Sequence, residues 1–570
     1  MANPSRVSSS KLFNKRASSL PQHPQGVGRG CKGAEAPTTT LHPQGVRRWG
    51  PRCCAATLPQ FGLLLLCAAW LLPGLVGHAP WKGGDGEHFV QLWQLLQSGV
   101  SPQAVPTTPP LYYWVAMATA WLASPVLPLA DGARLASGVF IVLALVFTAR
   151  TARVLYGDGT GWAAALTLLG CMGLLVRGHE LNAYTAQFAS AAIMLYGLAC
   201  LPRASHSGWA LGGGTVLMLL AGGAAEAAWF LLLAGMLPLL LEAYRTPAAR
   251  RSLFWGMGFA LVMGAAWLGY LATQSIPFER VLNLQRWIGD AGQRPAFYLG
   301  LLGWYAWPAW PLAAWALYRS RRQWRAPGVV LPVGALLGLL GLYAFDAHPG
   351  EEQGLILLLP LTLLGAAGLF TLRRGAANAL LWFGVMLFGF MALVFWIYWS
   401  AHDLGTPARL AARLTKLGMT RVGEFRPWAL TLGLAVTLIW IVFLSRVSRS
   451  PLRPMLVWTA SMTFMWVLLM ALFQAPLDHR LSYASVGEVL AARVPAADCI
   501  QADQMRRQQR VLLGYHSKRQ LIPADAGCRW LLLETRDRGA EPQPSPDWVE
   551  QWRGARPGDR SDQFYLYARR

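Results

Sequence analysis

Charged residues are scarce in this 570-residue sequence, in which Asp, Glu, Lys and Arg together make up only 14%. Soluble globular domains carry about a quarter charged residues, so this deficit argues against a soluble protein. Hydrophobic residues make up 54% of the chain and gather in many runs of 17–22 residues. A run of about 20 apolar residues can cross a bilayer as a helix. The sequence therefore predicts a polytopic membrane protein.

Acidic residues are the scarcer of the two charged classes, with 27 Asp and Glu against 50 Lys and Arg and a net charge of +23. The basic residues are spread through short loops between the apolar runs rather than gathered in one patch. This distribution is typical of membrane proteins, in which positive loops stay on the cytoplasmic side. We therefore expect membrane lipids as partners and no nucleic acid.

Cysteine pairs with metal-binding spacing are also absent, since none of the eight Cys forms a Cys-x-x-Cys pattern. Cys499 and Cys528 lie in the C-terminal region, which we expect outside the membrane, and are candidates for a disulfide. Tryptophan is abundant, at 27 residues, and often stands near the ends of apolar runs. Such Trp residues anchor helices at the membrane interface, although stacking on a sugar is an alternative for some.

Three regions follow one another along the chain. Residues 1–60 hold nine Lys and Arg against one acid, and the pentapeptide His-Pro-Gln-Gly-Val occurs twice, at 23–27 and 42–46. Such a segment cannot build a core, so we expect a disordered basic N-terminal tail. Residues 61–474 form the transmembrane region, which begins with a signal-anchor candidate. Residues 475–570 are polar enough for a small soluble domain.

The transmembrane region divides into thirteen expected spans. They cover 61–77, 134–155, 160–177, 182–201, 208–223, 226–243, 252–272, 297–318, 328–345, 354–371, 379–400, 427–446 and 454–474. The apolar stretch 111–123 is counted as a helix lying at the outer interface, because only then do all strongly basic loops fall on one side. The N-terminus is then cytoplasmic, and the large loop 78–133 and residues 475–570 are outside.

The C-terminal domain shows both helical and strand patterns. Residues 485–493 have a helical pattern, whereas 510–514, 530–534 and 563–568 have the pattern of strands. The fold class is thus mostly α, with a small extracytoplasmic α/β domain at the end of the chain.

The large outer loop opens with two acids and an imidazole directly after the first span, at Asp85, Glu87 and His88. Ionisable groups at a membrane boundary are costly unless solvated or functional. Asp85 is a candidate general base toward a sugar or lipid hydroxyl, with Glu87 as a second catalytic acid. With Glu87 and His88 it is also a candidate ligand of a divalent cation. The alternative is a solvated loop start.

Further ionisable residues fall on the same side of the expected topology. They are His179, Glu180, Glu226, Asp346, His348, Glu351 and Glu352. Each alone is typical of a solvated loop, but their shared sidedness indicates one polar cavity that opens outward. The outer loop 273–296 adds Arg280, Arg286 and Arg294, whose guanidinium groups suit phosphate oxygens. They could instead contact lipid head groups.

The order of these elements resembles a family of bacterial membrane glycosyltransferases that take a sugar from a polyprenyl-phosphate donor. The aminoarabinose transferase acting on lipid A and protein mannosyltransferase-like enzymes are members. The resemblance runs loosely from residue 61 to 570. It rests on the acidic loop start at 81–91, Thr-Pro-Pro-Leu-Tyr-Tyr-Trp at 108–114, Arg134-Leu135, Gln-Arg-Pro-Ala-Phe-Tyr at 293–298, Trp307-Pro308 and Leu359-Pro360-Leu361.

The resemblance implies a GT-C-like fold with thirteen spans, an outer loop with a catalytic acid and an external α/β domain. It puts Asp85 on the position of the family's first acid, and Thr108 and Tyr112 in its segment for the lipid phosphate. The departures are specific: Thr108 replaces the phosphate-binding Lys, and Glu226 replaces the Lys of a Lys-Gly motif. Glu180 or Asn182 is nearest to a usual Asp, and Glu351-Glu352-Gln353 replaces a basic stretch.

Together these observations predict an inverting glycosyltransferase in the bacterial inner membrane. It would move a sugar from a polyprenyl-phosphate donor to an envelope lipid, glycan or protein acceptor. Asp85 would deprotonate or orient the acceptor, Arg286 and Arg294 would steady the leaving phosphate, and Glu180 and Glu351 would bind sugar hydroxyls or a metal. The alternatives are a transporter of lipid-linked sugars, which favours polar residues near the membrane midplane, and a non-catalytic glycolipid-binding protein.

Overall fold

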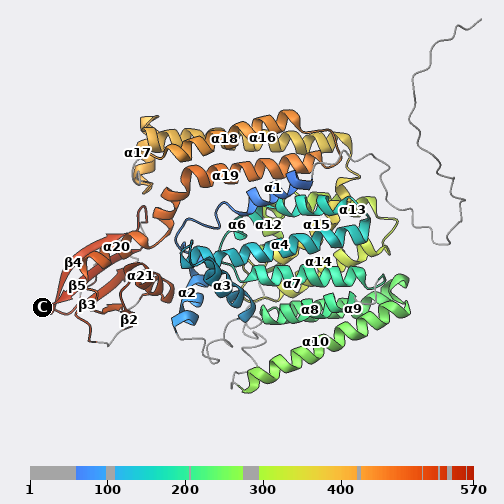
Figure 1. Ribbon diagram of the computed structural model, residues 1–570, viewed down its shortest axis with the longest axis horizontal. Coiled ribbons are helices and arrows are strands. Elements are labelled where there is room, and N and C mark those ends of the chain that lie inside the picture. Colours follow the sequence, from blue (N-terminus) through green and yellow to red (C-terminus); the bar gives the residue numbers. More distant parts are fainter. Residues whose placement is uncertain are drawn as a thin grey trace, which may run out of the picture. The chain divides into compact units, whose positions relative to one another are not determined.

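A computed structural model describes residues 60–97, 109–203, 207–273, 294–419, 425–502, 505–523, 527–535, 542, 544–559 and 562–570. The expected N-terminal tail lies outside these residues. Figure 1 shows a bundle of long helices with a small sheet at one end.

The first half of the bundle follows the apolar runs of the sequence closely. Its helices are α1 (Gln60–Leu71), α2 (Gly84–Gln97), α3 (Pro110–Ala123), α4 (Leu129–Tyr156), α5 (Thr160–Leu169), α6 (Met172–Arg177), α7 (Tyr184–Cys200), α8 (Ser207–Leu220), α9 (Ala224–Leu240) and α10 (Pro247–Thr273). The short 3₁₀ turn η2 (Glu242–Tyr244) joins α9 to α10.

The second half continues in the same way to residue 481. Its helices are α12 (Arg294–Tyr305), α13 (Ala309–Arg319), α14 (Pro327–Ala344), α15 (Leu355–Leu369), α16 (Arg374–Trp399), α17 (Ala408–Lys416), α18 (Pro427–Arg446) and α19 (Arg453–Leu481). A π-helical turn, η4 (Ser400–Leu404), extends α16.

Two expected spans are each divided into two helices. The run 160–177 breaks at Gly170 and Cys171, between α5 and α6. The run 297–318 breaks before α13 at Pro308, whose backbone has no N–H to continue the hydrogen-bond ladder. The first span also ends early, because α1 stops at Leu71 and Pro73-Gly74 follows. Hydrophobicity sets the extent of these runs, whereas Gly and Pro set the breaks within them.

Six of the described helices are long and apolar enough to cross a membrane, namely those at Leu129–Tyr156, Pro247–Thr273, Pro327–Ala344, Arg374–Leu404, Pro427–Arg446 and Arg453–Leu481. Shorter apolar helices lie at Phe61–Leu71, Thr160–Leu169, Ser207–Leu220, Ala224–Leu240 and Leu355–Leu369. The chain is thus mostly helical with multiple candidate spans. The total of thirteen stays a prediction, as does the interfacial position of α3.

The helices pack through small residues as well as through large ones. Gly208 of α8 and Gly256 of α10 face each other so closely that a Cβ on Gly208 would lie 2.0 Å from the carbonyl oxygen of Ser252. A Cβ on Gly132 of α4 would lie 2.9 Å from the Cα of Ala120 in α3. Close backbone approach at small residues is how helices associate in lipid, where the hydrophobic effect between them is weak.

Residues 484–570 contain a five-stranded mixed sheet with two helices, α20 (Ala484–Arg493) and α21 (Arg507–Ser517). Its strands are β1 (Ile500–Ala502), β2 (Leu521–Ile522), β3 (Trp530–Thr535), β4 (Trp548–Ala555) and β5 (Gln563–Arg569), in the order β2-β1-β3-β5-β4. β1 runs parallel to β2 and β3, whereas β5 pairs antiparallel with β3 and β4. The expected α/β character is confirmed.

The expected strand at 510–514 is wrong, because these residues lie inside helix α21. Three consecutive apolar residues cannot distinguish a strand from one turn of a helix. Gln509 accepts a hydrogen bond from the backbone N–H of Arg506 at the helix start, and Leu512 and Leu513 are buried. Tertiary packing and the helix cap therefore decide the structure of this segment.

The candidate disulfide is present. Cys499, next to β1, is bonded to Cys528, just before β3, and the two Cα atoms are 5.4 Å apart. The bond therefore links two neighbouring parallel strands of which one is only three residues long.

Candidate functional site

Three segments far apart in the sequence meet through charged side chains. They are the start of α2, the connection from α6 to α7, and the loop before α15. Arg177 bonds Glu351 at 2.5 Å, and His88 Nε2 lies 3.4 Å from Glu352 Oε2. We call Arg177, Glu180, His88, Glu351 and Glu352 the acid–arginine cluster. The structure thus brings Glu180, Glu351 and Glu352 together, as their shared side of the expected topology indicated.

Arg177 is the cation of this cluster. It ends the short helix α6 and donates from Nη1 to Glu180 Oε2 at 3.1 Å and from Nη2 to Glu351 Oε2 at 2.5 Å. About a fifth of its side chain stays exposed. An arginine that holds carboxylates in this way can also hold phosphate oxygens, because both ligands offer negatively charged oxygen acceptors to its N–H donors.

Glu180 stands three residues after Arg177 and is the member of the cluster whose pKa lies near neutral pH. Burial raises the pKa of its carboxyl to about 7, although the Arg177 guanidinium acts in the opposite direction. A carboxyl with this pKa exchanges its proton near neutral pH, as general acid–base catalysis requires.

Glu352 lies on the other side of the cluster, beside His88 of α2. Burial alone would raise the pKa of Glu352, but the hydrogen bond and charge of His88, together with the charge of Arg177, hold it below its ordinary value. His88 Nδ1 lies 2.8 Å from the hydroxyl of Tyr113, which in turn donates to Gln91. Two neighbouring carboxyls, Glu180 and Glu352, thus have pKa values moved in opposite directions.

Gly84 lets these carboxylates approach the start of α2. A Cβ at this position would lie 2.4 Å from Glu352 Oε1 and 3.7 Å from Glu180 Oε2. Since Cβ contacts under 3.0 Å are essentially never seen, a side chain here would displace Glu352. The absence of a side chain at Gly84 therefore lets Glu352 and Glu180 lie close to the start of α2.

Asp85 is almost completely buried beside the cluster and accepts four hydrogen bonds. Oδ1 accepts from Arg134 Nε at 3.1 Å and from the backbone N–H of Leu181 at 2.8 Å. Oδ2 accepts from Arg134 Nη2 at 3.2 Å and from the backbone N–H of Trp81 at 2.8 Å. Burial would raise the pKa of Asp85, but the Arg134 guanidinium more than offsets this and lowers it.

A carboxylate has about four acceptor positions, and all four of Asp85 are used within the chain. Asp85 therefore has no acceptor position left for a substrate hydroxyl in this geometry. Its low pKa also makes it a weak base. The structure supports a positioning role for Asp85 in place of the predicted direct contact with an acceptor.

Arg134 is the centre of the buried network that holds Asp85. Its Nη1 donates to Asp131 Oδ1 at 2.8 Å and to the carbonyl oxygen of Leu75 at 3.1 Å. Asp131 Oδ2 in turn accepts the backbone N–H of Gly77 at 2.7 Å. The resemblance had singled out Arg134 only as part of a two-residue motif; its role in tying α4 to the turn after α1 required the structure.

The backbone of residues 180–182 is held by three side chains. Ser137 Oγ donates to the carbonyl oxygen of Glu180 at 2.7 Å, and Asp85 accepts the N–H of Leu181. The hydroxyl of Tyr112 accepts the N–H of Asn182 at 3.0 Å. Helices α2, α3 and α4 thus fix the segment that carries Glu180. Tyr112, which the resemblance assigned to substrate binding, is itself fully buried.

The predicted metal set does not form. Asp85, Glu87 and His88 lie at the start of α2, where Asp85 and His88, three residues apart, share one face of the helix and Glu87 points away from it. Asp85 is buried against Arg134, Glu87 is exposed, and His88 contacts Tyr113 and Glu352. Within the residues that the structure describes, no three His, Cys, Asp or Glu side chains are grouped as metal ligands.

Other predicted residues lie apart from the cluster or outside the described ranges. His179 is buried and bonded to the carbonyl oxygens of Leu175 and Trp70. Glu226 is buried in the first turn of α9, and Asp346 accepts the backbone N–H of His348. Thr108, Arg280 and Arg286 fall outside the described residues, and the side chain of Arg294 is not described.

Sequence reasoning missed Arg177. It was counted as the last residue of an apolar span, although a charged residue three positions before Glu180 is a signal for an ion pair on a helix end. The contact of Arg177 with Glu351 could not be anticipated, because it joins residues 174 positions apart.

Solved structures share this fold. ArnT from Cupriavidus metallidurans, in a crystal structure bound to undecaprenyl phosphate, matches with a TM-score of 0.63 at 14% identity over 89% of this chain and 97% of that chain. Its apo structure gives the same TM-score and identity over 98% of that chain. The arabinosyltransferase EmbB from Mycobacterium smegmatis matches with a TM-score of 0.41 over 76% of this chain and 43% of that chain.

No protein-family model matches the sequence, and a search of curated proteins finds no match. The expected resemblance in fold is confirmed by the ArnT structures over nearly the whole of both chains. At 14% identity this likeness concerns the fold, and the chemistry has to be argued from the residues of this chain.

Proposed function

We propose that the protein is a glycosyltransferase of the bacterial inner membrane that takes its sugar from a polyprenyl-phosphate donor. An envelope lipid, glycan or protein is the acceptor, and the sheet domain lies in the periplasm. The observation that carries the proposal is the pairing of Arg177 with Glu180, which puts a partly exposed guanidinium beside a carboxyl with a pKa of about 7. The ArnT-like fold supports a polyprenyl-phosphate ligand, since one ArnT structure holds undecaprenyl phosphate.

Arg177 is proposed to bind the phosphate of the donor. Its guanidinium is partly exposed and already holds two carboxylates, of which Glu351 belongs to a separate loop. A phosphate oxygen that replaced Glu351 would accept the hydrogen bond of Arg177 Nη2 in its place and keep it charge-assisted. As the bond between sugar and phosphate breaks, negative charge grows on the phosphate oxygens, and a fixed cation there stabilises the transition state.

Glu180 is proposed as the general base. The acceptor hydroxyl oxygen would form a bond to the anomeric carbon of the sugar while the bond from that carbon to the phosphate oxygen breaks. The hydroxyl proton passes to Glu180, and the polyprenyl phosphate leaves with the bonding electrons. Attack from the face opposite to the leaving group inverts the anomeric configuration. Glu352 and His88 are placed to hydrogen-bond sugar hydroxyls on the other side of Gly84.

Asp85, Arg134 and Tyr112 are proposed to position Glu180 through the backbone of residues 180–182. The hydrogen bonds from Leu181 to Asp85 and from Asn182 to Tyr112 support this role. Arg286 and Arg294 remain sequence-based candidates for a second contact to the phosphate. Thr108 could contribute a hydroxyl at the position where the family resemblance implies a lysine.

The test is mass spectrometry of envelope glycolipids, polysaccharides and proteins from strains without the gene and strains complemented with native protein, Glu180→Gln or Glu87→Gln. Glu87, predicted from the sequence as a second catalytic acid but exposed in the first turn of α2 and without a role in the proposed reaction, is the control. We expect a sugar-sized mass to be lost in the deletion and restored by native protein and by Glu87→Gln only, at equal membrane abundance. Full restoration by Glu180→Gln would remove Glu180 as base and favour the transport or binding alternatives.

A further inference from the structure

The helix α17 (Ala408–Lys416), between the candidate spans Arg374–Leu404 and Pro427–Arg446, has a strongly basic face. Arg409, Arg413 and Lys416 recur at spacings of four and three residues, which places them on one side of the helix. All three side chains are exposed. The helix contains no acidic residue.

Leucine side chains lie on the adjacent side of the same helix. Leu410, Leu414 and Leu417 follow each basic residue by one position, and Leu414 is the buried member that anchors α17 to the protein. A cavity of about 270 Å³, lined by residues of η4 and α17 including His402 and Asp403, lies beneath the helix. The helix is thus held at its apolar edge and leaves its basic face to the surroundings.

Exposed apolar side chains precede and follow α17 in the chain. Leu404, Leu417, Phe425 and Trp428 have exposed fractions of 56, 49, 42 and 57%. A helix with a cationic face and neighbouring Leu, Phe and Trp side chains is typical of the membrane–water interface. Only 22% of the hydrophobic stretch of the preceding span and 11% of the following one are buried within the protein. Both neighbours of α17 therefore face lipid rather than protein.

The location of this positive charge is unusual for a membrane protein. Residues 405–426 contain five Lys and Arg but one acid, whereas positive loops normally stay on the cytoplasmic side. α17 nevertheless lies at the end of the bundle that carries the sheet (Figure 1), and a Cβ on Gly418 would lie 2.1 Å from the backbone nitrogen of Gly558 in the sheet domain. In the proposed topology, with the sheet domain outside, a negative partner at this end would offset the charge.

We infer that α17 is an interfacial helix that binds the head groups of anionic phospholipids in the leaflet on the side of the sheet domain. Arg409, Arg413 and Lys416 contact the phosphates, and Leu404, Leu417 and Trp428 enter the acyl boundary. The basic side chains can extend toward the head groups while their methylene stems cover apolar surface. This site is separate from the acid–arginine cluster and does not depend on the proposed reaction.

The test is hydrogen–deuterium exchange of the backbone at 405–419 in the full chain. The protein is reconstituted in nanodiscs of phosphatidylcholine or of equal parts phosphatidylcholine and phosphatidylglycerol. We expect exchange to slow in phosphatidylglycerol. Each basic residue at an anionic surface contributes roughly fivefold in affinity for the membrane. The difference in exchange between the two lipid compositions should vanish in 1 M salt, where the Debye length falls to about 3 Å.

Two triple variants make the test specific. In the first variant, Gln replaces Arg409, Arg413 and Lys416. Its backbone at 405–419 should exchange equally in both lipids. The control removes the same charge from an exposed cluster elsewhere, with Gln replacing Arg319, Arg321 and Arg322, and should keep the native response to phosphatidylglycerol.

Equal exchange of the native chain in the two lipids would overturn the inference, whatever the variants do. So would protection of α17 that arises only when soluble envelope proteins are added, because the negative partner would then be an acidic protein.

Discussion

At the scale of single residues, the two acids Asp85 and Glu180 have opposite pKa shifts, and the role of base, expected at Asp85 from the sequence, passes to Glu180 in our proposal. Asp85 has all four acceptor positions filled and a lowered pKa, whereas Glu180 has a pKa raised to about 7. Burial acts on both carboxyls, and the difference arises from the number of cationic and N–H donors around each. The more buried acid organises the site, and the partly exposed acid is left to react.

The raised pKa of Glu180 predicts a pH dependence. A general base must be deprotonated, so kcat/KM should reach a plateau above pH 7 and fall about tenfold for each pH unit below it. Glu180→Gln should lower the rate by about 10²–10⁴-fold and abolish this acidic limb. The measurement is release of polyprenyl phosphate from a polyprenyl-phosphate-linked sugar by purified protein. An acidic limb unchanged in Glu180→Gln would show that another group titrates.

The buried pair of Arg134 and Asp85 predicts a large loss of stability when its cation is removed. Arg134→Ala leaves Asp85 and Asp131 buried without their partner, which should cost about 3–5 kcal/mol. Since the native pKa of Asp85 is lowered, the pair contributes fully above the unfolded pKa and its contribution is lost as pH falls through the folded pKa. Both pH 5 and pH 8 lie above the ordinary pKa of Asp, so the native pair contributes fully at both. In Arg134→Ala, burial without the cation raises the pKa of Asp85, and the variant should be less impaired at pH 5 than at pH 8 because protonation relieves the unpaired charge.

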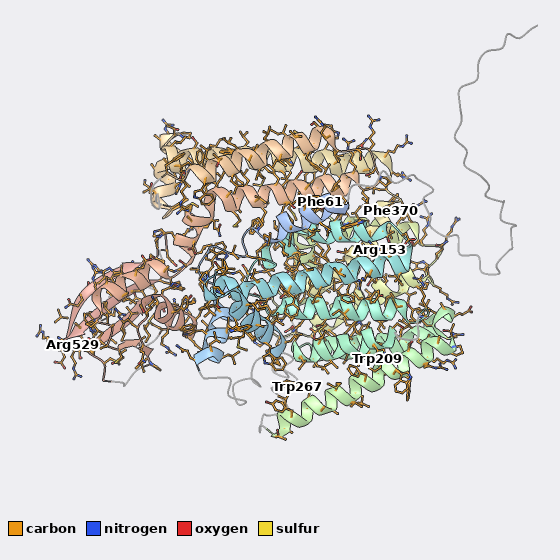
Figure 2. The ribbon with its side chains drawn as sticks, viewed as in Figure 1. Phe61, Arg153, Trp209, Trp267, Phe370 and Arg529 are labelled. Atoms are coloured by element: carbon orange, nitrogen blue, oxygen red, sulfur yellow. A yellow bond between two sulfur atoms is a disulfide. The ribbon has the colours of Figure 1, made fainter. Side chains whose placement is uncertain are left out.

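The measurement is the thermal unfolding midpoint in detergent at the two pH values. Arg153→Ala is the matched control, since Arg153 is an exposed arginine on the same helix α4 (Figure 2). Equal midpoints for both variants would argue against Arg134 as the centre of a stabilising network.

At the scale of elements, glycines decide how closely neighbouring helices pack. In α8, Gly208 touches the backbone of α10, whereas a Cβ on Gly213 would meet nothing within 4 Å. Both are glycines of α8, Gly208 at its second position and Gly213 in its interior, and of the two only Gly208 faces a neighbouring backbone. Comparing their substitution therefore tests the cost of this close approach.

Gly208→Ala should destabilise the protein by several kcal/mol or force α10 away from α8, because the new Cβ would overlap a carbonyl oxygen. Gly213→Ala should be neutral or stabilising by up to about 1 kcal/mol, since alanine favours the helix. Thermal unfolding in detergent measures both. A Gly208→Ala variant as stable as Gly213→Ala would contradict the close approach of the two backbones.

In the sheet domain, the disulfide stabilises a short central strand. Cys499 and Cys528 are 29 residues apart, and closing a loop of this length contributes about 3–4 kcal/mol in the chain-entropy model. Replacing both Cys by Ser should therefore lower the unfolding midpoint of the sheet domain and increase its proteolysis while the transmembrane helices stay resistant. Limited proteolysis followed by peptide mass mapping makes the comparison, and identical digestion patterns would contradict it.

At the scale of the whole molecule, the described helices place their charged ends on two sides. Figure 2 shows Arg153, from a basic cluster expected in the cytoplasm, at the end of the bundle away from Arg529 in the sheet domain. An odd number of spans puts the two chain termini on opposite sides of the membrane. The predicted thirteen spans therefore require the sheet domain to be periplasmic.

This topology can be tested by labelling single cysteines in intact cells with a reagent that does not cross the membrane. Thr415→Cys and Ser545→Cys, both exposed at the end with the sheet, should react. Gln323→Cys, exposed in a basic loop, should react only after permeabilisation. The chain without added cysteines measures the background. Labelling of Gln323→Cys in intact cells would invert the orientation or change the parity of the spans.

The sequence by itself determined the membrane class, the extent of most apolar helices and the α/β character of the last residues. These properties depend on composition and on periodicity over 10–20 neighbouring residues, which are local. It also indicated that Glu180, Glu351 and Glu352 share one side, since loop charges report sidedness. The breaks at Gly170 and Pro308 were visible in the sequence but were outweighed by continuous hydrophobicity.

Only the tertiary structure decided which of these residues meet. Arg177 and Glu351 are 174 residues apart, Arg134 and Asp85 are 49 apart, and no local pattern encodes either pair. The same is true of α21, where packing overrode a short strand-like run. It is also true of the predicted metal ligands, because Asp85 is bonded to Arg134, His88 contacts Glu352 and Glu87 is exposed. Side-chain chemistry was readable from the sequence, but the burial and partners that assign its roles arise from long-range contacts.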